Sequence, residues 1–212
     1  MIRRTNRIVQ KDFLKHNKNL NILDLGCSNN NYWEEANHFA DIHDFREEFS
    51  KLKLPFTKLE IGKRLPFKDK EFDYVILSHV MEHVENLLDF KQEVERIAKA
   101  GYIELPTKLN DNLVFGCDDE LGHKWWFEYD DDLQKLLYTK KIDALEKFLS
   151  VGSIWKFQHY FEDSFLLQLY WENTIDLKER APFKVESKIT FLTLVRKYFS
   201  KKIRSLFSKF KR

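Results

Sequence analysis

Short apolar runs, separated by turn residues, recur through the first half of the chain. The run Asn21–Gly26 ends at a glycine and predicts a buried strand, and Phe72–Ser78 gives the strongest strand pattern of the sequence. The segments Phe39–Asp44 and Phe56–Ile61 predict two further strands, the second by its alternation of apolar and polar positions. Four strands are therefore expected before residue 80.

A helical pattern follows these strands. Asn86–Ala100 has apolar residues at helical spacing, with Asn86 as the expected N-cap and Gly101 as the expected residue just beyond the C-cap. Tyr102–Leu105 predicts the next strand, which Pro106 ends. Strand, helix and strand in this order predict an α/β fold with a parallel sheet.

The pattern changes after Pro106. Trp125–Tyr129 and Leu133–Thr139 flank three aspartates and predict a hairpin, and Ile142–Phe161 predicts a helix. Phe165–Trp171 predicts a strand, and Phe183–Glu186 a short edge strand.

The last residues form one apolar helical stripe edged by lysine and arginine. Its members recur every three or four positions: Leu192, Val195, Phe199, Ile203, Leu206 and Phe210. Such a basic amphipathic helix is typical of interfacial membrane helices, so residues 190–212 are expected to meet an anionic membrane surface. Packing of the stripe on the domain or on a partner subunit is the alternative. The oligomeric state is left open.

Charge divides the chain in the same way. The net charge is +2, but residues 188–212 carry nine basic residues and no acid, which leaves residues 1–187 at −7. We therefore expect one domain over 1–187 and a helical tail over 188–212. The acidic body makes nucleic acid an unfavourable partner.

Composition narrows the class of protein. Of the 212 residues, 33% are charged and 43% hydrophobic, and no apolar run approaches the roughly 18 residues of a spanning helix. The N-terminus lacks the apolar stretch of a signal peptide, and Cys27 and Cys117 are too few for a disulfide scaffold. A cytoplasmic protein, at most peripheral at the inner membrane face, is expected.

Acidic residues lie at the ends of the first two predicted strands. Asp24 precedes a glycine turn, an arrangement that lets backbone N–H groups approach a nucleotide-like ligand. Asp41 and Asp44 end the second strand, where a carboxylate can accept both hydroxyls of a ribose. A plain turn is the alternative at both places.

Residues 79–83 read H-x-x-E-H, the inverted zinc-protease motif. On a helix, His79 and His83 would share one face and could hold zinc. The motif directly follows a buried strand, which disfavours a zinc hydrolase, and no metal ligand is assigned.

Taken in order, these segments resemble the class I S-adenosylmethionine-dependent methyltransferases of the type 11 group. NILDLGCSNNN is similar to the first motif, LPFKDKEFDYVILSHVMEHV to the fourth-strand motif and GYIELP to the fifth strand, over about residues 20–106. A subgroup also shares GYIE-x-P followed by HKWWF. The resemblance implies a Rossmann-like, mostly parallel seven-stranded sheet with helices on both faces, and makes residues 106–161 an insertion on the acceptor side.

The resemblance also implies a cofactor site for S-adenosylmethionine at the carboxyl ends of the strands. The turn after the first strand would hold the amino-acid end, Asp44 or else Asp41 the ribose, and an acid further on the adenine. The residues so assigned are Asp24, Gly26, Cys27, Ser28, Asp41, Asp44, Glu60, Ile61, Ser78 and His79. Ser28 and Asn30 stand where the family commonly has glycine, and the following helix is short.

The expected reaction is methyl transfer to oxygen or nitrogen of a small molecule, with a glycan or a lipid-linked precursor as a candidate. An oxygen acceptor benefits from a base, and His123, His79 and His83 are the catalytic candidates. His123 is favoured because Trp125 and Trp126 follow it and could shape an acceptor pocket. The alternative is that the two tryptophans are core residues, which would have no such role. A related binding protein without catalysis is the main alternative.

Overall fold

The computed structural model describes residues 1–113, 122–141, 162–180, 192, 195–200 and 202–203. The predicted helix 142–161 and edge strand 183–186 lie outside these residues. The described helices are α1 (Arg7–His16), α2 (Arg46–Lys51), α3 (Leu87–Ile97), α4 (Lys108–Leu113) and α7 (Glu162–Phe165).

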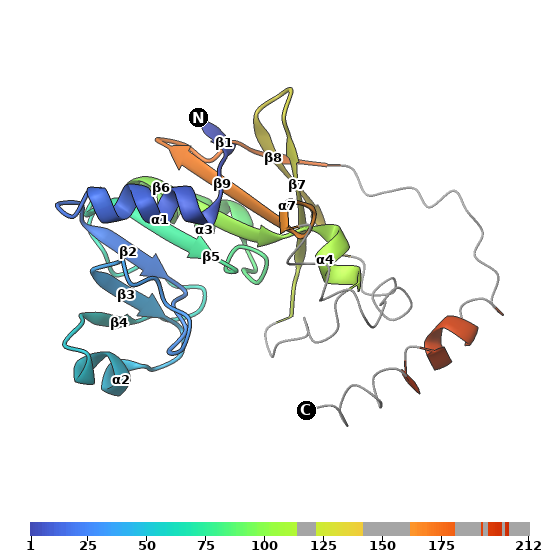
Figure 1. The fold of residues 1–212 in the computed structure, drawn as a ribbon, viewed down its shortest axis with the longest axis horizontal. Helices are drawn as coiled ribbons and strands as arrows, with labels where there is room; N and C mark the ends of the chain where they lie inside the picture. The colour runs from blue at the N-terminus through green and yellow to red at the C-terminus, as the bar shows by residue number, and fades with distance from the viewer. Residues whose placement is uncertain (114–121, 142–161, 181–191, 193–194, 201, 204–212) are drawn as a thin grey trace.

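The main sheet has seven strands in the spatial order β1-β9-β6-β5-β2-β3-β4 (Figure 1). In chain order they are β1 (Ile2–Arg4), β2 (Ile22–Leu25), β3 (His38–Asp41), β4 (Phe56–Lys58), β5 (Phe72–Ser78), β6 (Ala98–Pro106) and β9 (Leu166–Glu172). Strands β2 to β6 pair in parallel, whereas β9 is antiparallel to both β6 and β1. The mostly parallel α/β sheet predicted from the sequence is confirmed.

The chain reverses direction across this sheet next to β2. From β2 it moves outward to β3 and β4, then returns to β5 on the other side of β2 and continues to β6. Figure 1 shows β2, β3 and β5 pointing toward one edge. In open α/β sheets the crevice at the carboxyl ends of strands beside such a reversal is where ligands bind.

Alternating side chains of the strands build two apolar layers. On β5, Val75 and Leu77 belong to one layer, which also contains buried residues of α3. Tyr74 and Ile76 belong to the other, which contains Leu14 of α1. Because alternate residues point to opposite faces of a sheet, α1 and α3 cover opposite faces.

The end of the predicted helix 86–100 is wrong. Asn86 is the N-cap, since its side chain accepts from the backbone N–H of Asp89, but α3 ends at Ile97 and β6 begins at Ala98. Gly101 therefore lies inside β6, not beyond a helix end. A Cβ at Gly101 would collide with the carbonyl oxygen of Val75 and the indole nitrogen of Trp171, which explains the glycine there.

The strands predicted over 39–44 and 56–61 also end early, at Asp41 and Lys58. The hairpin is confirmed: β7 (Trp125–Asp130) and β8 (Lys135–Lys140) pair antiparallel. Together with β10 (Leu177–Glu179), which pairs parallel to β8, they form a separate three-stranded sheet.

The described part of the C-terminal segment is helical over 195–200 and 202–203. Its apolar side chains face solvent, with Leu192 79%, Phe199 59% and Ile203 53% exposed. The described part of the stripe therefore does not pack into the core of the domain. Among the helices that the structure describes, none is long and apolar enough to cross a membrane.

Candidate active site

One row of residues crosses the carboxyl edge of the sheet. The parallel register pairs Ser78 of β5 with Glu104 of β6, and aligns the residue after β2 with the last residue of β3 and the last of β5. The row is therefore Asp41, Gly26, Ser78 and Glu104. The sheet brings these four residues together although they are distant in the sequence. Three of them, Asp41, Gly26 and Ser78, were assigned to the cofactor site from the sequence.

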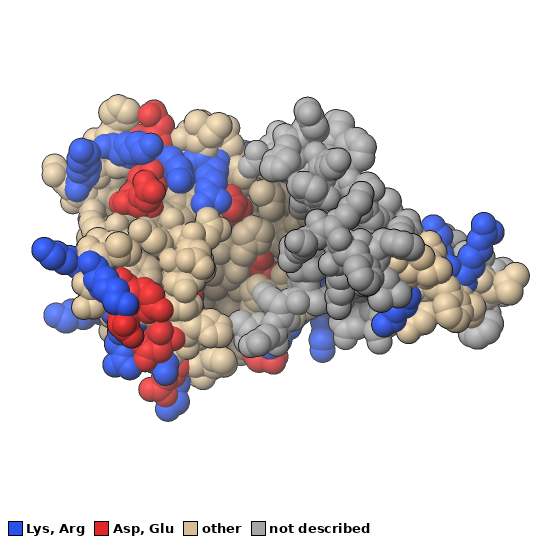
Figure 2. Space-filling view, turned by 60° about the horizontal axis from the view of Figure 1, so that its bottom comes forward, with Lys and Arg blue, Asp and Glu red and all other residues tan. Residues whose placement is uncertain are grey.

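Four carboxyl side chains are buried at this edge: Asp24, Asp41, Glu82 and Glu104, the only acidic residues classed as buried in the described part of the chain. Burial raises the pKa of Asp24 to about 7, against the opposing effect of the backbone N–H of Trp33. Burial also raises the pKa of Asp41. Figure 2 shows a hollow on this side of the molecule with acidic atoms in its depth. The edge therefore favours a cationic ligand.

The turn after β2 is built around Gly26. Its φ of +83° lies in the left-handed region, and a Cβ there would collide with the side chain of Val80. Cys27 is buried, and its thiol pKa is raised by burial. Ser28 is exposed, and its Oγ accepts from the backbone N–H of Asn31 at 2.8 Å. The side chain of Ser28 thus stabilises its own loop.

The short helix expected after the turn is not formed, since no helix connects β2 to β3. Instead, Trp33 is 1% exposed, and its backbone N–H donates to Asp24 Oδ2 at 2.8 Å. The indole packs against Tyr102, with the guanidinium of Arg7 over its ring. Trp33 closes the sheet where a helix would otherwise lie.

The two candidate ribose ligands differ in their surroundings. Asp41 is buried at the end of β3, and its Oδ1 accepts from the backbone N–H of His43 at 2.7 Å. Asp44 lies in the exposed turn beyond, where both its oxygens accept from Arg46, which lowers its pKa to about 2. Asp41 lies in the row at the sheet edge beside Gly26, whereas both oxygens of Asp44 are already engaged by Arg46.

Glu60 and Ile61 follow β4 at the same edge, because the N–H of Leu59 donates to the carbonyl of Asp41 at 2.7 Å. Ile61 is 70% exposed, and Glu60 forms an exposed ion pair with Lys63 at 3.4 Å. Both side chains are accessible beside Asp41, where the resemblance places the adenine.

His79 stands between two of the buried carboxylates. Its φ of +57° turns the chain sharply after β5, Nδ1 lies 3.1 Å from Glu82 Oε1, and Nε2 lies 3.7 Å from Glu104 Oε1. Burial alone would lower the pKa of His79, but the hydrogen bond to Glu82 and the charges of both acids raise it. The ring is 43% exposed. Ser78 Oγ donates to Glu104 Oε1 at 2.9 Å, so it orients this acid.

The other two candidate bases lie beyond His79. The rings of His83 and His123 are 4.7 Å apart, and His83 Nδ1 lies 3.0 Å from the carbonyl oxygen of Gly122. Residues 81–83 form a turn, so the helix that the zinc-protease interpretation requires is not present. The structure therefore gathers all three predicted histidines, through Glu82, at the end of β5.

Trp125 and Trp126 are packed rather than open. Trp126 is 6% exposed, and Trp125 is half-buried with its indole N–H donating to the carbonyl of Val84 at 2.8 Å. Their contacts attach β7 to the segment after β5. An open stacking platform for a sugar is therefore not formed by these two rings.

Sequence reasoning did not assign four residues that shape this site: Glu82, Glu104, Trp33 and Arg7. The sequence did contain a clue to Glu104, because it is a lone acid in an apolar strand, and the strand pairing places it beside Ser78. Arg7 had none, because its guanidinium reaches Glu104 at 3.5 Å from a helix 97 residues away.

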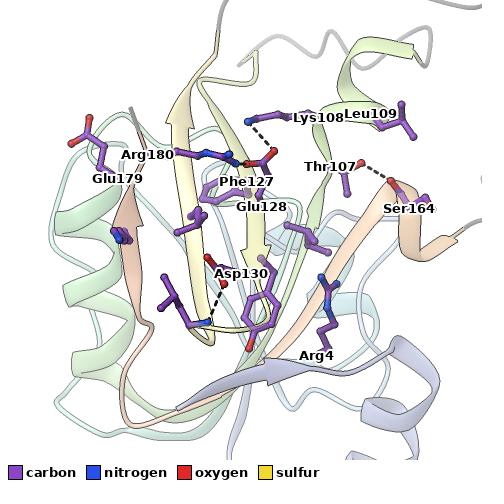
Figure 3. A pocket seen from close by; sticks show the side chains of 15 residues that line it. Arg4, Thr107, Lys108, Leu109, Phe127, Glu128, Asp130, Ser164, Glu179 and Arg180 are labelled. Carbon is purple, nitrogen blue, oxygen red and sulfur yellow. Dashed lines mark hydrogen bonds and ion pairs between the residues drawn. The ribbon is translucent and has the colours of Figure 1, made fainter. Parts of the chain in front are cut away.

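A separate cavity of about 760 Å³ lies between β9 and the three-stranded sheet. Figure 3 shows its polar lining, with Glu128 paired to Lys108 and Arg180 and with Thr107 donating to Ser164. None of the predicted cofactor or base residues lines it. This cavity therefore gives no evidence about the cofactor site or about the catalytic base.

The residues at the carboxyl edge fit S-adenosylmethionine. The cofactor carries two positive charges, on its ammonium and sulfonium groups, and the edge holds four buried carboxyl groups. Asp24 and Gly26 would hold the amino-acid end, and Asp41 the ribose.

The carboxyl edge has the features expected of a class I S-adenosylmethionine-dependent methyltransferase. Residues 23–103 match a family model described as a methyltransferase domain. This segment, which is less than half of the chain, is thus similar to a class of enzymes whose cofactor is S-adenosylmethionine. No curated protein matches the chain.

Several solved structures resemble the chain at low identity. A S-adenosylmethionine-dependent methyltransferase from Aquifex aeolicus is 16% identical, with 76% of this chain and 87% of that one covered and a TM-score of 0.41. One from Clostridium acetobutylicum is also 16% identical, with coverage of 60% and 64% and a TM-score of 0.38. The methyltransferase CalH in complex with SAH is 16% identical, with coverage of 48% and only 36% and a TM-score of 0.39. They indicate nothing about the acceptor of this chain.

Proposed function

We propose that the protein transfers the methyl group of S-adenosylmethionine to oxygen or nitrogen of a small molecule. The observation that carries this proposal is the placement of His79, a partly exposed imidazole, directly after Ser78, which lies in the same edge row as the cofactor turn at Gly26. A hydroxyl or ammonium acceptor must lose a proton, and an imidazole can take it. Transfer to carbon has a less direct use for such a base.

When bound, the cofactor supplies an electrophilic methyl group on a sulfonium sulfur. Asp24, Gly26 and Asp41 would hold the two ends of the cofactor beside β5. Ser78 and His79 then face the acceptor side. Holding both reactants in line accounts for much of the rate enhancement in such displacements.

His79 is the base in this proposal. Its Nδ1–H donates to Glu82, which fixes the tautomer and leaves the lone pair on Nε2 to take the acceptor proton. Glu104, 3.7 Å from Nε2, stabilises the positive charge that the ring gains. His123, favoured from the sequence, lies beyond Glu82 and beside His83, further along from the cofactor row.

A glycan or a lipid-linked precursor remains the acceptor class that a basic amphipathic tail favours. The packed tryptophans give no support to sugar stacking, so support for this choice comes from the exposed apolar residues of the tail. A lipid-linked acceptor would bring its reacting group to the domain while the tail lies on the same surface.

A binding role without catalysis is the second candidate. Asp24 already accepts from Trp33, and the helix that usually follows the cofactor turn is absent between β2 and β3. Both features weaken cofactor binding relative to catalysis-competent relatives. A protein that binds only the demethylated product, or neither form, would support this candidate.

The test is methyl transfer from labelled S-adenosylmethionine into a small-molecule extract, with formation of the demethylated product measured in parallel. The wild-type chain should transfer label in an extract-dependent manner. His79→Gln should bind the cofactor normally and lose at least about a hundredfold in turnover, whereas His16→Gln, an exposed change on α1, should have no effect. Undiminished transfer by His79→Gln would remove His79 as the base.

A further inference from the structure

Three potential metal ligands converge just beyond the cofactor row. Glu82, His83 and His123 each offer one ligand atom, and these atoms all lie within 4.8 Å of one another. We infer that they form a binding site for a divalent transition metal of the zinc type. Two imidazole nitrogens and one carboxylate oxygen are the ligand set of many catalytic zinc sites. The inference goes beyond methyl transfer and does not depend on it.

Glu82 provides the strongest evidence for a missing cation. Its side chain is 0% exposed, and Oε1 accepts from His79, but Oε2 is buried and without a hydrogen-bond partner in the described structure. A buried carboxylate oxygen without a partner costs substantial free energy. A cation bound at Oε2 would remove that cost, and Oε2 lies on the acid that the two histidines approach.

His83 is held in the tautomer that a metal requires. A carbonyl oxygen can only accept, so Nδ1 of His83 carries the hydrogen and donates it to Gly122 at 3.0 Å. The lone pair is then on Nε2, the ring nitrogen that would coordinate the ion. Metal-binding histidines characteristically donate their second ring N–H to a carbonyl or a carboxylate in this way.

The same pattern holds for the carboxylate. His79 Nδ1 lies 3.1 Å from Glu82 Oε1 and orients the acid from outside the cluster. His79 is therefore a neighbour of the site and not one of its ligands, which differs from the zinc-protease interpretation of the same motif.

Backbone contacts fix the two segments that carry the ligands. The N–H of Lys124 donates to the carbonyl of Glu82 at 2.7 Å, the indole of Trp125 donates to Val84, and Lys124 pairs with Glu85. These bonds hold His123 opposite Glu82 although 41 positions separate them. A site supported on both sides needs little rearrangement when it binds an ion.

The ligand atoms must draw together when zinc binds. Zn–N and Zn–O bonds of about 2.1 Å in a tetrahedral site place two ligands about 3.4 Å apart, so a pair at the 4.8 Å limit of the cluster must close by about 1.4 Å. Magnesium and calcium prefer all-oxygen sites and should bind far more weakly.

The experiment is calorimetric titration of the full, chelator-treated chain with zinc chloride, in the absence of S-adenosylmethionine. The wild type should bind one equivalent, and magnesium chloride should give no comparable signal. His123→Ala and Glu82→Gln should each weaken zinc binding at least about tenfold. His16→Ala, an exposed histidine on α1, is the matched control and should bind zinc like the wild type.

His123→Cys separates coordination from folding, because a thiolate is also a zinc ligand. It should restore the affinity that His123→Ala loses, and cobalt bound to this variant should gain a thiolate-to-metal absorption band that the wild type lacks. Zinc binding by His123→Ala and Glu82→Gln equal to that of the wild type would overturn the inference. Cofactor binding is measured separately. Zinc binding without cofactor binding would refute only the proposed function, and cofactor binding without zinc binding would refute only the metal site.

Discussion

The backbone N–H of Trp33 donates to Asp24 Oδ2 at 2.8 Å, with both residues almost fully buried. This bond joins the end of β2 to the short connection that replaces a helix before β3. It holds one oxygen of the first acidic residue of the site in the interior. The proposed contact with the amino-acid end of the cofactor would use the other oxygen.

Cofactor affinity should depend on pH through Asp24. Its folded-state pKa is raised to about 7, so the carboxyl is neutral below that value and gains its charge above it. Because the charged form attracts the cofactor ammonium, the Kd for S-adenosylmethionine should fall as pH rises through about 7. Calorimetry at about one unit below and one above this value measures the change, which should be up to about tenfold. Asp24→Asn should flatten the dependence; an identical dependence in this variant would assign it to another group.

The same group affects stability with the opposite dependence on pH. The unfolded carboxyl ionises near its usual value of 3.8, whereas the folded one keeps its proton to about 7. The folded state therefore binds more protons between these values, and its free energy of unfolding should decrease as pH rises across this window. Urea unfolding of the wild type and of Asp24→Asn gives the comparison. A contribution from Asp24 that grows with pH would contradict the burial of this carboxyl.

Asp41 and Asp44 form a matched pair for the ribose assignment. Asp41→Asn should weaken cofactor binding at least about tenfold, since it removes a charged acceptor at the sheet edge. Asp44→Asn should change affinity by less than about threefold, because Arg46 already holds both oxygens of Asp44. Dissociation constants of the two variants measure the difference. The reverse order would restore Asp44, the first choice from the sequence.

Gly101→Ala should destabilise the fold by about 2 kcal/mol or more, because the added methyl group meets the rigid backbone of β5 in a close-packed sheet. Gly62→Ala is the control, since nothing lies near a Cβ at Gly62 and only its positive φ is strained. That variant should lose about 1 kcal/mol. Equal losses in chemical denaturation would mean that the contact at Gly101 is not what excludes a side chain.

The C-terminal segment should bind anionic vesicles. Phe199 and Ile203 expose apolar side chains beside basic residues, so the full chain should co-sediment with anionic but not with neutral vesicles, and less so at high salt. Phe199→Ser with Ile203→Ser should lose most of this binding. Ile8→Ser, which removes an 81% exposed apolar side chain on α1, should not. Unchanged binding by the double variant would exclude the stripe as the contact surface.

The sequence predicted the main parallel strands well because each is a short apolar run that a turn residue ends. β5 spans the predicted residues 72–78 without change. Gly101 misled the prediction, since a glycine after a helical pattern is a local end signal, whereas the pairing of β6 with β5 is set by contacts between distant residues. Tertiary pairing began the strand three residues before that glycine.

In the candidate site, too, some features followed from the local sequence and others depended on contacts between distant residues. Asp24 and Gly26 lie at the end of one predicted strand and His79 directly after another, so topology alone brought them to one edge. The burial of Glu82 and its orphaned oxygen had no signal in the sequence, because they depend on the contact of residues 122–125 with residues 82–85. The choice between Asp41 and Asp44 likewise depended on a side-chain contact, the one with Arg46.

The most direct measurement is a calorimetric titration of the full chain with S-adenosylmethionine and, separately, with its demethylated product. The account predicts saturable binding of both ligands at one site per chain, lost in Asp41→Asn and retained in Asp44→Asn. Absence of binding by the wild-type chain to either ligand, in a protein shown to be folded, would contradict the assignment of the carboxyl edge as a cofactor site.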